Sequence, residues 1–295
     1  MSEIKLSVVI GTYNQKDKLK QVLASLFTQT LSPYFYEIVV VDSMSNDGTD
    51  AAIETLSPSC PLNYLRQENK GRPGARNRGI EEAKGEIIFL TDADMLADPN
   101  LLQEHLKAHE KMKNAAFEGL TYNFRSQIPD LQIPINKKLD IEPYIKEKLK
   151  PLHKIKWSYF LTGNLSIPRS IIKNAGMFDA DFSGYGWEDI ELGYRLHKLG
   201  VPLYYLLSAK NFHLHPVSDK EMYKRKYNMG KSAAIFYKKH PNLEIKYFLG
   251  MNPLAQGIYK LIKASPRLQK FIESKGGYLW GEFLYRKGLE EGLAT

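Results

Sequence analysis

The sequence predicts an α/β fold with a mostly parallel central sheet flanked by helices, followed by a helical C-terminal extension. Short runs rich in β-branched residues alternate with segments of helical periodicity, which is the layout of parallel strands joined by crossover helices. The strand runs are largely apolar, as expected of strands covered on both faces. Polar residues recur just after these runs, where parallel α/β sheets bind their ligands.

The first third of the chain predicts four strands with three helices between them. The strands are short apolar runs, and the helices either carry apolar residues at helical spacing or follow turn and glycine-rich stretches. The strands are expected at about residues 6–11, 37–42, 63–66 and 87–90, and the helices at about 16–27, 49–56 and 75–80.

The remaining chain continues the pattern less regularly. Helices are expected at about 100–113, after Pro168 and from 188, and strands at about 115–120, 160–167 and 203–206. Residues 126–156 are interpreted as a loop-rich excursion with a short helix near 143–149. Residues 217–295 are mostly helical, and periodic apolar residues there suggest packing either on the core or on a membrane surface: Ile245, Phe248, Leu249, Phe283 and Leu284.

Composition excludes several classes of protein. The chain has 295 residues, of which 43% are hydrophobic, and its single cysteine, Cys60, excludes an internal disulfide and a cysteine metal cluster. The N-terminus does not resemble a signal peptide, and no run approaches the roughly 18 apolar residues of a membrane span. We therefore expect a soluble, cytoplasmic protein.

The net charge of +8 is concentrated in the second half of the chain. A basic face attracts nucleic acid, anionic lipid or a phosphorylated substrate. Because the basic residues alternate with tyrosines and form no known nucleic-acid motif, we expect no nucleic-acid partner.

The most informative stretch is the apolar run 87–90 followed by Thr91, Asp92, Ala93 and Asp94. Two carboxylates at the end of a buried strand suit a hard divalent cation, which prefers oxygen ligands and bridges to phosphates. The alternative is that Asp92 caps the next helix and Asp94 is a solvated turn residue. Other polar residues follow neighbouring strands, and we expect them to converge on the same edge: Thr12, Asp42 and Arg76.

A second dense stretch runs from residue 178 to 196. Its glycines and aromatic residues predict a flexible loop, and Glu188 and Asp189 open a helix, where the macrodipole favours negative charge. The alternative is that both acids merely decorate the helix start. Glu191 and Arg195 are expected to pair on the helix surface, and His213 and His215 to share one face of a strand.

Known phosphate-binding patterns are absent. The first strand is followed by Gly11, Thr12, Tyr13 and Asn14 rather than by a dinucleotide-binding glycine motif, and no phosphate loop of the Gly-x-x-x-x-Gly-Lys-Ser/Thr type is present.

Five motifs, taken in order, resemble the family 2 glycosyltransferases of the A-type fold. They are Val8-Val9-Ile10 with Thr12-Tyr13-Asn14, Val40-Val41-Asp42 with Ser45-Asn46-Asp47-Gly48-Thr49, Asn69-x-Gly71 with Gly74-Ala75-Arg76-Asn77-x-Gly79, Asp92-Ala93-Asp94, and Gly186-Trp187-Glu188-Asp189 with Glu191, Tyr194 and Arg195. The last resembles the C-terminal galactosyltransferase-type segment of chondroitin-polymerase-like enzymes and β-1,4-galactosyltransferases. The resemblance covers about residues 5–216.

The resemblance implies a role for each matching position on the donor side. Residues Thr12, Tyr13, Asn14, Arg76, Asp92 and Ala93 would line the nucleotide pocket, and Asp42 would accept a hydrogen bond from uracil. Asp94, with Asp92 close by, would hold Mn²⁺ or Mg²⁺ against the diphosphate. Either His213 or His215 would complete the metal site.

On the acceptor side, the resemblance implies that Asp189 is the general base, with Glu188 beside it, and that Gly186, Trp187 and Glu188 contact the sugars. Residues 1–216 would form the catalytic domain, with a nucleotide-binding half at 1–98 and an acceptor half at 99–216. Residues 217–295 would form a helical extension.

The resemblance therefore predicts an inverting, metal-dependent glycosyltransferase that moves a sugar from a UDP-sugar to a glycan, a lipid-linked or another hydroxyl acceptor in cell-surface glycan, polysaccharide or glycoconjugate synthesis. Peripheral contact with the inner face of the membrane is left open, as are the donor sugar and the oligomeric state. The alternatives are a sugar-nucleotide-forming nucleotidyltransferase and a non-catalytic sugar-nucleotide or glycan-binding protein.

Overall fold

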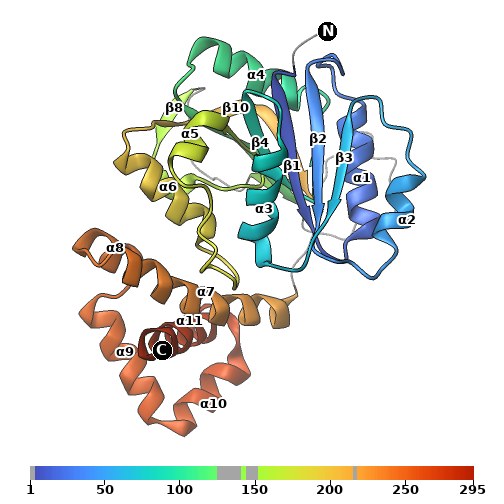
Figure 1. Ribbon diagram of the computed structural model, residues 1–295. Helices are drawn as coiled ribbons and strands as arrows, with labels where there is room; N and C mark the ends of the chain where they lie inside the picture. The colour runs from blue at the N-terminus through green and yellow to red at the C-terminus, as the bar shows by residue number, and fades with distance from the viewer. Residues whose placement is uncertain (1–3, 125–140, 144–151, 215–217) are drawn as a thin grey trace. The chain divides into compact units, whose positions relative to one another are not determined.

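The computed structural model describes residues 4–124, 141–143, 152–214 and 218–295 (Figure 1). The chain forms two compact units. Unit 1 comprises residues 1–180 and 192–216, and unit 2 comprises residues 181–191 and 217–295. The expected boundary at residue 216 is thus one of the points at which the chain passes between units, while the loop 181–191 groups with the C-terminal helices.

Unit 1 is built on a ten-stranded sheet, with β7 paired to β6 and β8 to β10 beside the main path β3-β2-β1-β4-β9-β6-β10-β5. The strands are β1 (Leu6–Thr12), β2 (Tyr36–Asp42), β3 (Leu62–Arg66), β4 (Ile87–Asp92), β5 (Met95–Ala97), β6 (Ala116–Phe124), β7 (Ile141–Pro143), β8 (His153–Ile155), β9 (Leu165–Pro168) and β10 (Leu203–His213). The strands β1, β2, β3, β4, β6 and β10 run in one direction. The predicted mostly parallel sheet is confirmed.

Helices cover both faces of this sheet (Figure 1). They are α1 (Lys16–Phe27), α2 (Thr49–Glu54), α3 (Gly71–Glu82), α4 (Leu101–Lys111), the 3₁₀ turn η1 (Trp157–Tyr159), α5 (Arg169–Asn174) and α6 (Glu188–Lys198), whose first turn belongs to unit 2. Val8 packs in one buried cluster with Leu23 of α1, and Val9 in another with Ile80 of α3. Successive strand residues point to opposite faces, so a strand covered on both faces is largely apolar.

The structure differs from the predicted elements in the second half of unit 1. β10 does not end near residue 206 but continues to His213, because β5 pairs with its last residues in antiparallel register. The expected strand at 160–167 is shorter, since β9 begins at Leu165 and η1 precedes it. The helix expected near 143–149 lies outside the described residues, apart from Pro143, which is in β7.

Unit 2 is helical, as predicted for the C-terminal extension. Its helices are α7 (Asp219–Lys239), α8 (Leu243–Phe248), α9 (Pro253–Ala264), α10 (Pro266–Lys275) and α11 (Gly277–Ala294). Ser218, Asn242, Asn252 and Ser265 cap α7 to α10, since each side chain accepts a backbone N–H of the first turn. In the described part of the chain, no helix is long and apolar enough to cross a membrane.

The periodic apolar residues of unit 2 divide between core and surface. Ile245, Leu249 and Phe283 are buried, so they pack on the core rather than on a membrane surface. Phe248 is 37% exposed, although its ring lies 5.6 Å from that of Trp187.

Candidate functional site

The carboxyl ends of the parallel strands bring the predicted polar residues together. In the register of the sheet, Thr12 at the end of β1 lies beside Asp42 at the end of β2. On the other side, Gly11 of β1 lies beside Asp92 at the end of β4. This is the edge at which ligands of parallel α/β sheets bind.

Two loops at this edge are joined by hydrogen bonds. The backbone N–H of Asn14 donates to Ser45 Oγ at 2.8 Å, and the N–H of Asn46 donates to Asn14 Oδ1 at 2.9 Å. Asn14 has a φ of 52°, a left-handed conformation that asparagine tolerates. Thr12 Oγ1 is buried and has no hydrogen-bond partner among the described residues, while Tyr13 is 51% exposed. The loop thus presents one buried hydroxyl and one exposed ring.

Asp42 is fully buried beneath this loop. Its Oδ1 accepts from the backbone N–H of Ser45 at 2.9 Å and from Ser45 Oγ at 2.6 Å, and its Oδ2 accepts from the hydroxyl of Tyr64. Burial and the bond to Asp42 raise the pKa of the Tyr64 hydroxyl above its ordinary value, so Tyr64 donates at neutral pH. The structure therefore holds the carboxylate in one orientation with three donors.

Arg76 of α3 faces Asp92. The Arg76 side chain is 5% exposed, and its Nη2 lies 3.0 Å from Asp92 Oδ1. The guanidinium carbon also lies 5.4 Å from the centre of the Phe178 ring. A buried guanidinium needs a compensating charge, and Asp92, whose side chain is 33% exposed, supplies it.

The structure contradicts the alternative interpretation of the two aspartates. Asp92 does not cap α4, because that helix begins after Asn100. Asp94 is not a solvated turn residue, since it is 8% exposed. Asp92 is therefore not a helix cap, and Asp94 is not a solvent-exposed turn residue.

Asp94 faces His213 across the sheet edge. Asp94 Oδ2 lies 3.5 Å from His213 Nε2, because the antiparallel pairing of β5 with β10 sets His213 opposite Met95. The backbone N–H of Leu214 donates to the Asp94 carbonyl at 2.8 Å, which fixes this geometry. His215 lies outside the described residues.

The pair can contribute to a metal site but does not form a closed one. Across residues 4–124, 141–143, 152–214 and 218–295, no three His, Cys, Asp or Glu residues are grouped so that they could hold a metal ion. Asp94 and His213 offer an oxygen and a nitrogen donor. This set fits a cation that takes its remaining ligands from phosphates and water, as Mg²⁺ commonly does.

The acidic pair of the second dense stretch begins α6 and belongs to unit 2. Glu188 is 2% exposed. Asp189 is half-buried, and its Oδ1 accepts from the backbone N–H of Ile190 at 2.8 Å. Gly186 and Trp187 have φ values of 88° and 74°, so the chain enters the helix through two left-handed residues.

Trp187 is anchored in the core of unit 2. Its Nε1 donates to the Met229 carbonyl at 2.9 Å. Its ring lies edge-on to Phe236 and Phe248, with centroids 6.3 Å and 5.6 Å away. This packing stabilises an unusual backbone conformation and fixes the position at which the acidic pair begins.

Glu191 and Arg195 were expected to pair on the helix surface, and the surface location is wrong, because Glu191 is 1% exposed. Glu191 Oε1 lies 2.8 Å from His240 Nε2 at the end of α7. Arg195 donates to the carbonyls of Ala175 and Met177, the second at 2.6 Å. Both side chains therefore point inward from α6.

Sequence reasoning missed two contributors to the donor-side edge. Tyr64 holds Asp42, but a tyrosine in a short strand carries no distinguishing signal. Asn77 follows Arg76, and its side chain donates to the Phe178 carbonyl at 2.7 Å and accepts from the Phe178 N–H at 2.9 Å. The polar pair Arg76-Asn77 within α3 was the available signal.

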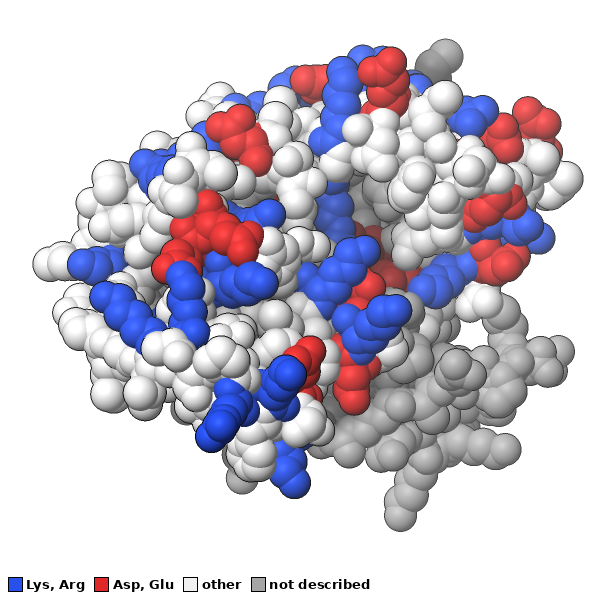
Figure 2. Space-filling view, turned by 90° about the horizontal axis from the view of Figure 1, so that it is seen from below, with Lys and Arg blue, Asp and Glu red and all other residues white. Residues whose placement is uncertain are grey.

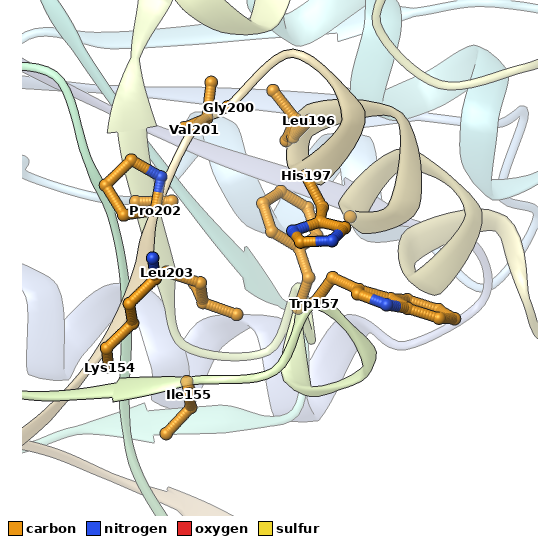
Figure 3. A pocket seen from close by; sticks show the side chains of 12 residues that line it. Lys154, Ile155, Trp157, Leu196, His197, Gly200, Val201, Pro202 and Leu203 are labelled. Atoms are coloured by element: carbon orange, nitrogen blue, oxygen red, sulfur yellow. The ribbon is translucent and has the colours of Figure 1, made fainter.

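Two other features lie outside this edge. A cavity of about 130 Å³ is lined by residues that include Trp157, His197 and Pro202 (Figure 3). It lies where β6 and β10 begin, opposite the carboxyl ends. Cys60 is buried, and burial raises the pKa of its thiol to about 11, so it is not a nucleophile at neutral pH.

Fold and site together define an α/β protein with polar side chains gathered at the carboxyl edge of its sheet. The chain belongs to glycosyl transferase family 2, whose family model matches residues 7–173. The predicted family is therefore confirmed.

Curated relatives agree with this assignment. The chain is 31% identical over 242 residues to the uncharacterized glycosyltransferase YfnE of Bacillus subtilis (67% of this chain, 62% of the relative). It is 30% identical over 262 residues to a validoxylamine A glucosyltransferase of Streptomyces hygroscopicus subsp. limoneus (81% and 57%). It is 28% identical over 239 residues to a chondroitin synthase of Escherichia coli (72% and 35%). The match thus spans less than two thirds of the length of YfnE and of the validoxylamine A glucosyltransferase.

Solved structures confirm the A-type fold. A mannosyltransferase from Pyrobaculum calidifontis, in complex with GDP-Man and Mn²⁺, matches with a TM-score of 0.63 at 18% identity, covering 99% of this chain and 87% of that chain. TarS 1-349 of S. aureus, in complex with UDP, matches with a TM-score of 0.58 at 17% identity, covering 98% and 91%. At these identities the likeness concerns the fold.

Proposed function

We propose that this protein is an inverting, metal-dependent glycosyltransferase that moves a sugar from a UDP-sugar to an acceptor hydroxyl in glycan or glycoconjugate synthesis. The observation that carries the proposal is the carboxyl edge of the sheet in a family 2 chain. This edge holds Asp42 on one side of β1 and the Arg76–Asp92 ion pair on the other. The Asp94–His213 pair lies where β4 leads into β5.

On the donor side, Asp42 is proposed to read the uracil ring. It is held by Ser45 and Tyr64, which leaves its orientation fixed for a further donor. The exposed ring of Tyr13 and the buried hydroxyl of Thr12 supply stacking surface and a polar contact. TarS has been solved with UDP and with UDP-GlcNAc, which supports UDP. The mannosyltransferase with GDP-Man makes GDP the competing nucleotide.

Asp94 and His213, with Asp92, are proposed to hold Mn²⁺ or Mg²⁺. When bound, such an ion offsets the negative charge that develops on the departing diphosphate. Asp94 supplies the buried carboxylate, and the 3.5 Å approach of His213 supplies the nitrogen donor. The Mn²⁺ in the mannosyltransferase complex supports this assignment.

Asp189 is proposed to take the proton of the acceptor hydroxyl as it attacks the anomeric carbon. The amino end of α6 favours a negative charge there, and a carboxylate is the form that accepts a proton. A single displacement needs one base and no enzyme nucleophile, and it inverts the anomeric centre. Gly186, Trp187 and Glu188 are proposed to position the sugars.

Two alternatives are less well supported. A sugar-nucleotide-forming nucleotidyltransferase would carry a basic, glycine-rich loop after the first strand, whereas this chain has Thr12, Tyr13 and Asn14 bonded to the next loop. A non-catalytic binding protein would need neither Asp94 beside a histidine nor Asp189 at a helix start.

The proposal is tested by incubating the full chain with a panel of UDP-sugars and GDP-mannose, with Mn²⁺ or with chelator, and measuring release of the nucleoside diphosphate. We expect Mn²⁺-dependent release from at least one UDP-sugar. Release from GDP-mannose alone would overturn the uracil assignment, and release unaffected by chelator would overturn the metal assignment.

A further inference from the structure

The helix α9 of unit 2 is apolar on two sides, and only one of them is packed. Tyr259 and Ile262 are buried in a cluster with Ile272 and Phe283. On the other side, Leu254, Ile258 and Leu261 are 76%, 49% and 67% exposed. Their spacing of four and three residues places them on one helix face. This face, named here the α9 face, has no partner among the described residues.

The following helices also carry exposed apolar side chains. Phe271 on α10 is 58% exposed, and Tyr278 and Leu279 at the start of α11 are 77% and 57% exposed. Single exposed apolar residues are ordinary, but several on one helix face, as on α9, indicate an interaction site. Three consecutive helices of unit 2 thus carry large apolar side chains that unit 2 itself does not cover.

The charge of the chain is concentrated in the same segment. Residues 217–295 contain 15 Lys and Arg against 7 Asp and Glu, whereas residues 1–216 contain 26 of each, so the net charge of +8 belongs to the C-terminal segment. Lys260, Arg267 and Lys270 lie on α9 and α10 and make no ion pair within the part of the chain that the structure describes. In the view of Figure 2, Lys and Arg side chains are interspersed with uncharged ones.

We propose that the α9 face, with the exposed residues of α10, binds peripherally to an anionic lipid surface. A helix that lies in the membrane interface buries apolar side chains at the headgroup boundary, while flanking Lys and Arg contact lipid phosphates. Leu254, Ile258 and Leu261 supply the apolar contact, and Lys260, Arg267 and Lys270 supply the charge. A second copy of the chain is disfavoured as the occupant, since its equivalent face carries the same positive charge.

This inference does not depend on the proposed reaction, because it concerns binding by a surface outside the candidate site. The probe is the full chain mixed with vesicles of phosphatidylcholine alone or of phosphatidylcholine with phosphatidylglycerol, followed by sedimentation. We expect binding to the anionic vesicles only. Added salt should weaken it, since anionic headgroups attract basic side chains within a Debye length.

Paired variants make the test specific. Leu261→Glu should weaken binding to anionic vesicles roughly tenfold or more, because it places a negative charge in the apolar contact, next to the negatively charged headgroups. Lys260→Glu should act in the same direction. Leu199→Glu is the control, because Leu199 is 62% exposed but lies in unit 1. All three positions are at the surface, so the midpoint of thermal unfolding should stay unchanged.

Absence of binding to anionic vesicles would overturn the inference, as would equal loss in Leu199→Glu or equal binding to uncharged vesicles. A concentration-dependent dimer that Leu261→Glu disperses, without vesicle binding, would overturn it in favour of a second copy. Capture of an acidic protein without lipid binding would overturn it in favour of a protein partner.

Discussion

At the residue scale, the donor side of the site depends on groups whose orientation is fixed by neighbours. Asp42 is held by Ser45 and Tyr64, and Asp92 by Arg76. A fixed acceptor discriminates between ligands because an analogue without the matching donor leaves the buried group unsatisfied. Predictions at this scale therefore concern nucleotide choice and metal dependence.

The first prediction concerns the base. UDP carries a ring N–H that cytidine diphosphate lacks, so a site that reads it through Asp42 should bind cytidine diphosphate about tenfold more weakly or worse. Calorimetry with both nucleotides measures this. Tyr64→Phe removes one of the hydrogen-bond donors that hold Asp42. This variant should stay folded, and its affinities for UDP and cytidine diphosphate should differ less than those of the unmodified protein. Equal affinities in the unmodified protein would mean that Asp42 only terminates β2.

The second prediction concerns the metal. Asp94→Ala should remove the gain in UDP affinity that Mn²⁺ provides. We expect the affinity measured with Mn²⁺ to fall by at least about 10²-fold, because even residues that only orient metal ligands contribute up to about that factor. The matched control is Asp50→Asn, since Asp50 forms an exposed ion pair with Arg66 that contributes little to stability. If Asp94→Ala still binds UDP more tightly with Mn²⁺ than with chelator, Asp94 is not a ligand.

At the element scale, unit 2 depends on the close crossing of α7 and α11. A Cβ atom on Gly230 would lie 1.9 Å from the Tyr285 carbonyl oxygen, and one on Gly288 would lie 2.1 Å from that of Tyr227. The two backbones can approach only because both positions are glycine.

The third prediction follows from this crossing. Gly230→Ala and Gly288→Ala should each lower the free energy of unfolding by about 1–3 kcal/mol, the cost of forcing extra atoms into a packed interface. Gly257→Ala in α9 is the control, because nothing lies within 4 Å of its added Cβ. It should raise stability by about 0.5–1 kcal/mol through helix propensity. Urea unfolding measures all three, and an unaffected Gly230→Ala would contradict the close crossing.

The helix α4 carries two histidines that are buried against β9. His105 Nδ1 and His109 Nε2 each lie 2.8 Å from Ser166 Oγ, and His105 Nε2 lies 2.9 Å from Asn164 Oδ1. Burial lowers the pKa of His105 from 6.5 to about 4 and that of His109 from 6.5 to about 3. Both rings are therefore neutral in the folded protein at moderately acidic pH.

The fourth prediction is a loss of stability in acid. As pH falls below 6.5 the unfolded chain binds protons at these histidines, while the folded chain does not until about pH 4 or 3. The free energy of unfolding should therefore fall by up to about 1.4 kcal/mol per pH unit for each histidine. Urea unfolding between pH 7 and pH 5 measures the slope, and His109→Phe should flatten it. An unchanged slope in that variant would contradict the neutral burial of His109.

At the scale of the whole molecule, the sequence predicted those elements whose pattern is continuous. The strands β1, β2 and β4 were predicted because a parallel strand covered on both faces is largely apolar, as Val8 and Val9 illustrate. The three-residue strands β5, β7 and β8 were not, since their pairing with β6 or β10 defines them. The second half of β10 contains Ser208, Lys210 and Asn211, which give no strand period.

The candidate site likewise contains residues that the sequence predicted and contacts that it did not predict. Asp92 and Asp94 could be predicted because two carboxylates after a buried strand are unusual. The partnership of Asp94 with His213 could not, since it arises from the β5–β10 register. The sequence left His213 and His215 equivalent, and the described geometry places only His213 beside Asp94. Tyr64 and Phe178 contribute through tertiary contacts, which cannot be predicted from the spacing of residues in the sequence.

The most direct test of the central claim measures the transfer rate and UDP affinity together in Asp189→Asn and Glu188→Gln, once the donor is known. Asp189→Asn should keep donor affinity and lose transfer by roughly 10²–10⁴-fold, the usual effect of removing a general base. Glu188→Gln should have a smaller effect. If Asp189→Asn transfers at the normal rate while Glu188→Gln does not, the base is Glu188. If both variants transfer normally, the proposed acceptor side of the reaction is contradicted.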